Sequence, residues 1–327
     1  MAAPDLVRIA HRCLRDLTEL QPQHHVLVVT DDETAEVAEA WAAAATTLAA
    51  EVMTIRMETR ARHGAEPPPA VAQAMLGADL IVQAVSRALT HTDASRAAMA
   101  RGAQVFVLRG ITAAMMRSDL MRVDYAELRR VTGALAARLE AGDAAHLTSP
   151  AGTDLRFHVS GRRAFALAGG TGPGRFGGAR SGEAAIAPSE GSAEGVVVIE
   201  HAMDDLGLLD APIRLTLSAG RVTRVEGGAS AATLQRMLAE AGEGATNLAE
   251  VAIGTNPAAR LSANLAEAKK VRGTVHVALG DDVSLGGSVR AALHLDGMVL
   301  SPTLSVGDDV LVRDGVLVPG AAGDPPR

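Results

Sequence analysis

The chain has 327 residues, of which 48% are hydrophobic and 21% charged, the balance of a globular protein with one large or two ordinary domains. The net charge of −7 and the small aromatic content (four Phe, one Trp, one Tyr) argue against nucleic acid as a partner, and no apolar run reaches the ~18 residues of a membrane span. The single cysteine, Cys13, excludes a disulfide framework, and the first seventeen residues carry acids and arginines unlike a secretory signal, so we expect a cytoplasmic protein.

The first half of the chain alternates short β-branched runs with Ala-rich or amphipathic stretches. Strands are predicted at 25–30, 51–57, 80–85 and 104–110, and helices at 4–20, 33–50, 93–100 and 125–139. Asp31 and Asp32 are expected to cap the helix that follows them. Because strands that alternate with helices form parallel sheets with right-handed crossovers, we predict a doubly wound, Rossmann-like α/β domain at 1–145.

The second half is rich in glycine and alternates like half-buried strands. Strands are predicted at 153–161, 194–202 and 213–228, a helix at 230–241, and short strands from 247 onward, after a Gly-rich loop at 167–181. Residues 146–327 therefore predict a mixed, mainly antiparallel α+β domain. The last ten residues, VPGAAGDPPR, are expected to be loosely attached.

Four ionisable residues interrupt the apolar strands of this second domain: Glu250, His276, His294 and Asp296. Residues two apart on a strand share a face, so the imidazole of His294 and the carboxylate of Asp296 should point together. A buried carboxylate is costly unless it is paired, hydrogen-bonded or metal-bound. Two imidazoles and two carboxylates suit Zn, Mn, Fe or Co better than Ca or Mg, although hydrogen-bonded core side chains are the alternative.

Five blocks of sequence, in order, resemble the aminopeptidase T/aminopeptidase S family of metallopeptidases and its shorter relatives, which include 2,5-dihydroxypyridine 5,6-dioxygenase. The blocks are SPAGTDLRFHVSGR (149–162), APSEGSAEGVVVIE (187–200), AEVAIGTNPAARL (249–261), GTVHVALGDDVSLGG (273–287) and HLDGMVLSPTL (294–304). The resemblance implies that Glu250, His276, His294 and Asp296 bind one or two divalent metal ions. It also implies that Glu190 is a further ligand or general base, and that the protein is a homodimer.

Two positions depart from these relatives. Val283 stands where the aminopeptidases carry a tyrosine, and Glu250 aligns with a histidine ligand of the dioxygenase, whose Fe(II) is held by two His and one Asp. His276 could restore a two-His-one-carboxylate set with His294 and Asp296.

The Gly-rich loop contains two arginines, Arg175 and Arg180, that could bind a substrate carboxylate if the loop closes over the site. A solvated loop is the alternative for both side chains.

These features lead to a main hypothesis of function and two alternatives. The main hypothesis is a metal-dependent hydrolase that cleaves an amide, lactam or peptide-type bond of a small molecule with metal-activated water, with Glu190 or Glu250 relaying the proton. The second is a non-haem Fe(II) dioxygenase that opens the ring of a hydroxylated N-heterocycle, ranked lower because four protein ligands leave few positions for O₂ and substrate. The third is a non-catalytic protein that keeps the fold.

Overall fold

The structure is a computed structural model that describes residues 2–320, so the expectation for the C-terminal tail falls mostly outside the described residues. The chain divides into two compact units. The first comprises Met1–Val123 and Ala168–Ser181, and the second comprises Asp124–Leu167 and Gly182–Arg327. Within the described range, no helix combines the length and the apolar character that crossing a membrane requires.

The first unit is built on a five-stranded parallel sheet with the strand order β2-β1-β3-β4-β8. Its strands are β1 (His25–Thr30), β2 (Glu51–Arg56), β3 (Leu80–Ala84), β4 (Gln104–Val107) and β8 (Phe176–Gly177). Its helices are α1 (Pro4–Leu17), α2 (Ala35–Ala45), α3 (Pro69–Met75), α4 (Asp93–Ala100) and α5 (Ala113–Arg117), with a 3₁₀ turn η1 (Asp119–Met121). The predicted parallel α/β architecture is confirmed.

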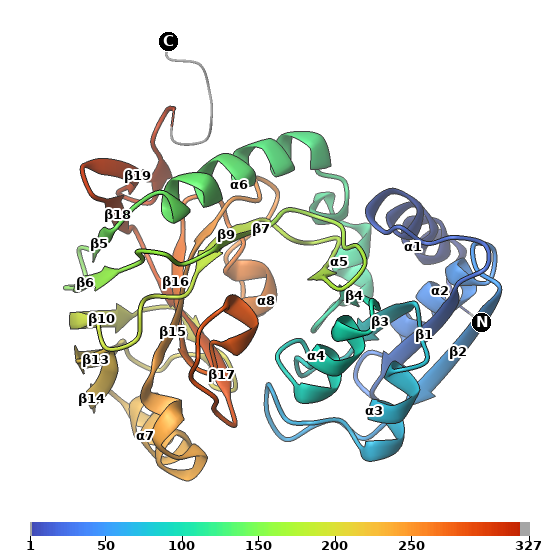
Figure 1. Cartoon of the computed structure of the whole chain (residues 1–327), viewed down its shortest axis with the longest axis horizontal. Coiled ribbons are helices and arrows are strands. Elements are labelled where there is room, and N and C mark those ends of the chain that lie inside the picture. Colours follow the sequence, from blue (N-terminus) through green and yellow to red (C-terminus); the bar gives the residue numbers. More distant parts are fainter. Residues whose placement is uncertain (1, 321–327) are drawn as a thin grey trace. The chain divides into compact units, whose positions relative to one another are not determined.

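Helices cover both faces of this sheet (Figure 1). Leu27 and Val29 of β1 share a buried cluster with Met75 of α3. On the other face, the ring of Phe106 on β4 packs against Trp41 of α2, with ring centroids 5.3 Å apart. Burial on both faces explains why these strands read as continuous apolar runs in the sequence.

The two aspartates after β1 do not cap α2, contrary to the expectation. Thr34 occupies the cap position, and the buried Asp31 accepts hydrogen bonds from the backbone N–H (2.7 Å) and hydroxyl (2.6 Å) of Ser86 instead. The exposed Asp32 forms an ion pair with Arg56. Asp31 thus joins the carboxyl ends of β1 and β3, a contact that a local sequence pattern cannot show.

The unit boundary differs from the expected one at 145. Helix α6 (Tyr125–Glu140) belongs to the second unit, because its buried Val131 and Leu135 join that unit's core. The expected Gly-rich loop belongs in large part to the first unit, where its two-residue strand β8 pairs in parallel with β4.

The second unit contains two antiparallel sheets. The eight-stranded sheet has the order β14-β13-β10-β6-β5-β18-β19-β20, formed by β5 (Ala144–Thr148), β6 (Asp154–His158), β10 (Glu194–Ile199), β13 (Ile213–Ser218), β14 (Arg221–Glu226), β18 (Thr303–Val306), β19 (Asp309–Arg313) and β20 (Val316–Leu317). The seven-stranded sheet has the order β12-β11-β17-β16-β15-β9-β7, formed by β7 (Ala164–Leu167), β9 (Glu183–Ile186), β11 (Ala202–Met203), β12 (Gly207–Leu208), β15 (Leu248–Gly254), β16 (Val275–Gly280) and β17 (His294–Val299). The remaining elements are α6, α7 (Ala229–Ala241), α8 (Leu265–Ala268), η2 (Glu243–Thr246) and η3 (Val283–Leu285).

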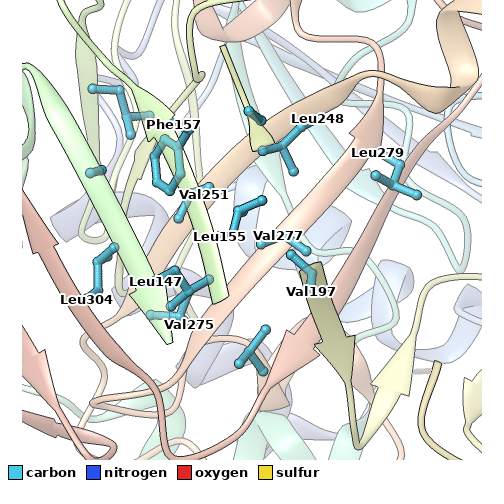
Figure 2. Close-up of a cluster of buried hydrophobic side chains, with 14 of the residues drawn as sticks. Leu147, Leu155, Phe157, Val197, Leu248, Val251, Val275, Val277, Leu279 and Leu304 are labelled. Atoms are coloured by element: carbon cyan, nitrogen blue, oxygen red, sulfur yellow. The ribbon is translucent and has the colours of Figure 1, made fainter. Parts of the chain in front are cut away.

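One hydrophobic core is shared by both sheets of the second unit. Figure 2 shows Leu155 and Phe157 of the eight-stranded sheet gathered with Val251, Val275 and Val277 of the seven-stranded sheet. Since side chains alternate along a strand, this core uses only one face of the seven-stranded sheet. The opposite face is therefore available for other chemistry.

Candidate metal centre

Five buried ionisable side chains lie on the face of the seven-stranded sheet that points away from the core. They are Glu183 of β9, Glu250 of β15, His276 of β16, and His294 and Asp296 of β17, with exposed fractions between 0% and 6%. Their chain neighbours Ala184, Val251, Val277 and Leu295 are all members of the core cluster. The period of two along each strand therefore directs all five ionisable groups to the same side.

A register irregularity lies beside Glu250. Val251 and Ile253 belong to the core, so the period of two already turns Glu250 to the opposite face. The pairing of β15 with β16 shifts register between Leu248 and Glu250, and Leu248 also belongs to the core. The shift thus lets Leu248 pack in the core although regular alternation would place it on the face of Glu250.

The strand register leaves room between the donors. Glu250 pairs with Ala278, and Ala278 pairs with Asp296, so a methyl group on β16 separates the carboxylates of the two strands that flank it, β15 and β17. His276 likewise pairs with Ala252 on β15. Small side chains between converging donors leave a space that a metal ion can fill.

The donor atoms form two overlapping groups of three, Glu183–Glu250–His276 and Glu250–His294–Asp296, each with ligand atoms within 4.8 Å of one another. Nε2 of His294 lies 3.1 Å from Glu250 Oε2 and 3.4 Å from Asp296 Oδ1. Nε2 of His276 lies 3.4 Å from Glu183 Oε2 and 3.5 Å from Glu250 Oε1. Glu250 is shared by both groups.

The chemistry of these donors fits a divalent transition metal. Within residues 2–320, neither ring nitrogen of the buried His276 has a hydrogen-bond partner, and neither does Glu183 Oε2. Leaving such groups buried and unbonded costs about 1–3 kcal/mol each. An ion bound between imidazole nitrogen and carboxylate oxygen removes a cost of this kind, so the donor types of the cluster fit such an ion.

The second imidazole is oriented by the backbone. His294 Nδ1 lies 2.7 Å from the carbonyl oxygen of Asp281, which assigns the proton to Nδ1 and turns Nε2 toward Glu250. Outer contacts of this kind fix the tautomer of metal-ligating histidines. His294 is thus oriented so that Nε2 is the atom that would bind a metal.

Two ammonium groups complete the cluster. Lys269 Nζ lies 2.5 Å from Asp296 Oδ2 and 3.8 Å from Glu183 Oε2. Lys270 Nζ forms an ion pair with Glu183 Oε1. Sequence reasoning missed both lysines, because they follow α8 and not the strands that carry the other donors.

The pKa values of the donors favour ionised carboxylates. Burial alone would raise the pKa of Glu250, but the adjacent imidazoles of His276 and His294 outweigh it and hold this pKa well below its usual range. Burial is likewise outweighed at Asp296, where the ammonium of Lys269 and the imidazole of His294 lower the pKa well below normal. Burial would lower the pKa of His294, yet Asp296 and Glu250 raise it well above normal.

Burial and neighbouring charge also oppose each other at Glu183 and Lys270. At Glu183, burial opposes ionisation, and the charges of Lys269 and Lys270 outweigh it, so the pKa is lowered. Burial lowers the pKa of Lys270 to about 8 despite the carboxylate beside it. These groups therefore form an ion-paired layer next to the donor set.

The structure brings together the four ligands proposed from the sequence and adds Glu183. The signal for Glu183 is an acid inside the buried run EAAI, the same kind of signal that singled out Glu250. The two imidazoles fall into different groups, each with two carboxylates, so His276 does not join the set formed by His294 and Asp296.

Three predicted residues lie outside the two donor groups. Glu190 forms an ion pair with Arg162 and accepts hydrogen bonds from the backbone N–H and hydroxyl of Ser288, both 2.8 Å long. Arg175 and Arg180 belong to the first unit, where Arg175 lies 3.8 Å from Glu19 and Arg180 is buried. The proposed catalytic role of Glu190 and the substrate-binding roles of the two arginines stay predictions.

The fold and the donor set define a class of metal-binding enzyme in which a parallel α/β unit precedes an antiparallel unit that carries the metal ligands. The sequence matches the family model described as NicX, 2,5-dihydroxypyridine 5,6-dioxygenase, over residues 5–319. The chain therefore belongs to this family, which confirms the resemblance stated above.

Solved structures share the fold. The structure is similar to 2,5-dihydroxypyridine dioxygenase from Pseudomonas putida KT2440, with a TM-score of 0.79 and 19% identity, covering 97% of this chain and 98% of that one. It is also similar to wild-type AmpT from Thermus thermophilus, with a TM-score of 0.70 and 17% identity, covering 96% of this chain and 99% of that one. A search of curated proteins found no matching sequence.

The main functional hypothesis from the sequence, a metal-dependent hydrolase, is wrong. The family match is to a dioxygenase, and the dioxygenase structure has the higher TM-score of the two structures compared. The metal ligands that supported the hydrolase are compatible with either chemistry, so donor types alone could not decide between them.

Proposed function

We propose that this protein is a non-haem iron(II) dioxygenase that opens the ring of a hydroxylated N-heterocycle. The observation that carries the proposal is the match to the 2,5-dihydroxypyridine 5,6-dioxygenase family over residues 5–319. The buried imidazole and carboxylate groups support it, since N and O donors suit Fe(II). Iron, when bound, supplies the electrons with which O₂ is activated.

Glu250, His294 and Asp296 would hold the ion. The carbonyl of Asp281 fixes the ring of His294, and Lys269 fixes one oxygen of Asp296. This group has one imidazole and two carboxylates, whereas the resemblance describes two His and one Asp, and Glu250 is the residue that differs. A second carboxylate makes the donor set more anionic.

The donors are shielded by apolar side chains on their own face of the sheet. Met298 of β17 forms a buried cluster with Ala202 of β11 and with Leu265 and Ala268 of α8. Excluding water there strengthens electrostatic interactions between substrate and protein and suppresses side reactions. The chain's contribution is thus to bind, orient and exclude water.

Oxygen consumption tests the proposal. The protein is stripped of metal, reconstituted anaerobically with Fe(II), and mixed with oxygenated buffer and a panel of dihydroxypyridines and catechols. We expect substrate-dependent O₂ uptake with at least one dihydroxypyridine and loss of pyridine absorbance. Asp296→Asn should lower the rate by at least ~100-fold, because second-sphere changes alone cost about 10–100-fold.

Asp143→Asn is the matched control, because this carboxylate lies in the same unit but is exposed and bonds only outside the centre, to Ser160 and His158. Its rate should equal that of the unchanged protein. Absence of uptake with every compound of the panel, in protein shown to contain iron, would overturn the proposal.

A further inference from the structure

The two lysines at the centre are the only lysines in the chain. The sequence has 31 Lys and Arg residues, and all except Lys269 and Lys270 are arginines. Arginine serves at every other basic position, so the only ammonium side chains of the chain lie at this centre. Lysine presents a compact point charge, whereas the guanidinium of arginine is planar and larger.

Both ammonium groups are buried beside the donors. The side chains of Lys269 and Lys270 are 13% and 11% exposed. Lys269 links Asp296 to Glu183, so it joins a carboxylate from each donor group, and Lys270 holds the other oxygen of Glu183. Each lysine-bound carboxylate keeps one oxygen turned toward an imidazole, Asp296 toward His294 and Glu183 toward His276.

The charges in the cluster match one divalent ion better than two. Three carboxylates and two ammonium groups give a net charge of −1 when the imidazoles are neutral. One divalent ion changes this total to +1 and two ions change it to +3, whereas without the lysines two ions that share Glu250 would give +1. Uncompensated charge is costly at buried positions, so the ammonium groups and a second ion compete for the same carboxylates.

We propose that the ammonium groups of Lys269 and Lys270 take the place of a second metal ion, so that this five-donor centre binds a single divalent ion. Glu183 contacts both ammonium groups, whereas Glu250 contacts the two imidazoles. The ion therefore binds in the group Glu250–His294–Asp296, and Glu183 serves as the counter-ion of the lysines. This inference concerns metal stoichiometry, so it does not depend on which reaction the centre performs.

Metal counting tests the proposal on the full chain. Metal-free protein is titrated with Mn²⁺ in a calorimeter, and the bound metal is measured by elemental analysis after gel filtration. We expect one Mn²⁺ per chain for the unchanged protein and two for Lys270→Met, which keeps an unbranched side chain one atom shorter and removes the charge. Lys270→Arg, which keeps the charge, should still bind one.

A double variant shows where the second metal ion binds. Adding Glu183→Gln to Lys270→Met removes a ligand of the Glu183–Glu250–His276 group, so the count should return from two to one. Electron paramagnetic resonance distinguishes an isolated Mn²⁺ from a coupled pair in the same samples. Circular dichroism establishes that each variant is folded.

Three results would overturn the proposal. One is two ions per chain in the unchanged protein, an observation that needs no variant and so holds even if Lys270→Met fails to fold. Another is a count of one in folded Lys270→Met. The last is a count of two that persists in the Glu183→Gln double variant, since this would place the second ion elsewhere.

Discussion

At the scale of single residues, the centre is governed by the competition between burial and neighbouring charge. The imidazole of His294 is buried, yet two carboxylates raise its pKa well above the usual value. In metal-free protein at neutral pH, this ring is therefore protonated and cannot offer Nε2 to an ion. Metal binding must expel that proton.

The expected consequence is a proton release that can be measured. Calorimetric titration with Mn²⁺ at about pH 7, in two buffers of different ionisation enthalpy, should report about one proton released per ion. The affinity should rise up to ~tenfold per pH unit as the pH increases, and level off above the raised pKa of His294. An affinity independent of pH between about 6 and 8 would contradict this assignment.

At the scale of secondary structure, one strand position depends on a glycine. Gly182 precedes Glu183 with φ of +140°, and an added Cβ would lie 2.7 Å from Asn256 Cβ and 2.9 Å from its backbone nitrogen. Its carbonyl also accepts a hydrogen bond from the backbone N–H of Thr255 (2.8 Å). Only glycine allows β9 to approach β15 this closely and so places Glu183 in the cluster.

Gly182→Ala should therefore destabilise the protein by about 2–3 kcal/mol, the sum of backbone strain and a clash with neighbouring backbone. Gly161→Ala is the matched control, since Gly161 also has positive φ (+70°) but an added Cβ meets nothing within 4 Å. Gly161→Ala should destabilise the protein by about 1–2 kcal/mol, because it introduces backbone strain without a clash. Chemical denaturation measures the free energy of unfolding of both variants. Equal losses would show that the neighbouring backbone shifts and relieves the clash.

At the scale of the whole molecule, every donor of the centre comes from the second unit. The first unit supplies a parallel α/β sheet and, by expectation, the arginines of the Gly-rich segment. The homodimer that the resemblance implies stays a prediction, which the mass of the protein in solution tests. Because every donor lies in the second unit, a bound metal ion should stabilise that unit directly.

Hydrogen exchange can locate this stabilisation. At a Mn²⁺ concentration about 100 times Kd, binding stabilises the native form by about 2.7 kcal/mol, which slows exchange about 100-fold for amides that exchange only when the second unit unfolds. We expect this slowing in peptides from β9, β15, β16 and β17, and little change in β1 to β4. Equal slowing in both units would show that they unfold together.

Features that depend on neighbours along the chain could be predicted from the sequence. Strands buried on both faces read as apolar runs, so the parallel sheet of the first unit was predictable. His294 and Asp296 lie on one strand two residues apart, so their shared face follows from strand periodicity alone. The family resemblance was likewise carried by contiguous blocks of residues.

Which strands lie side by side could not be predicted in this way, because strand pairing depends on how the whole chain packs. Glu183 joins Glu250 because β9 pairs with β15, and Glu250 approaches Asp296 because both of their strands pair with β16. The two lysines reach the donors from the end of α8, and α6 joins the second unit through its packing. Pairing and packing bring distant residues together through contacts that depend on the whole chain, whereas periodicity is a property of each strand alone.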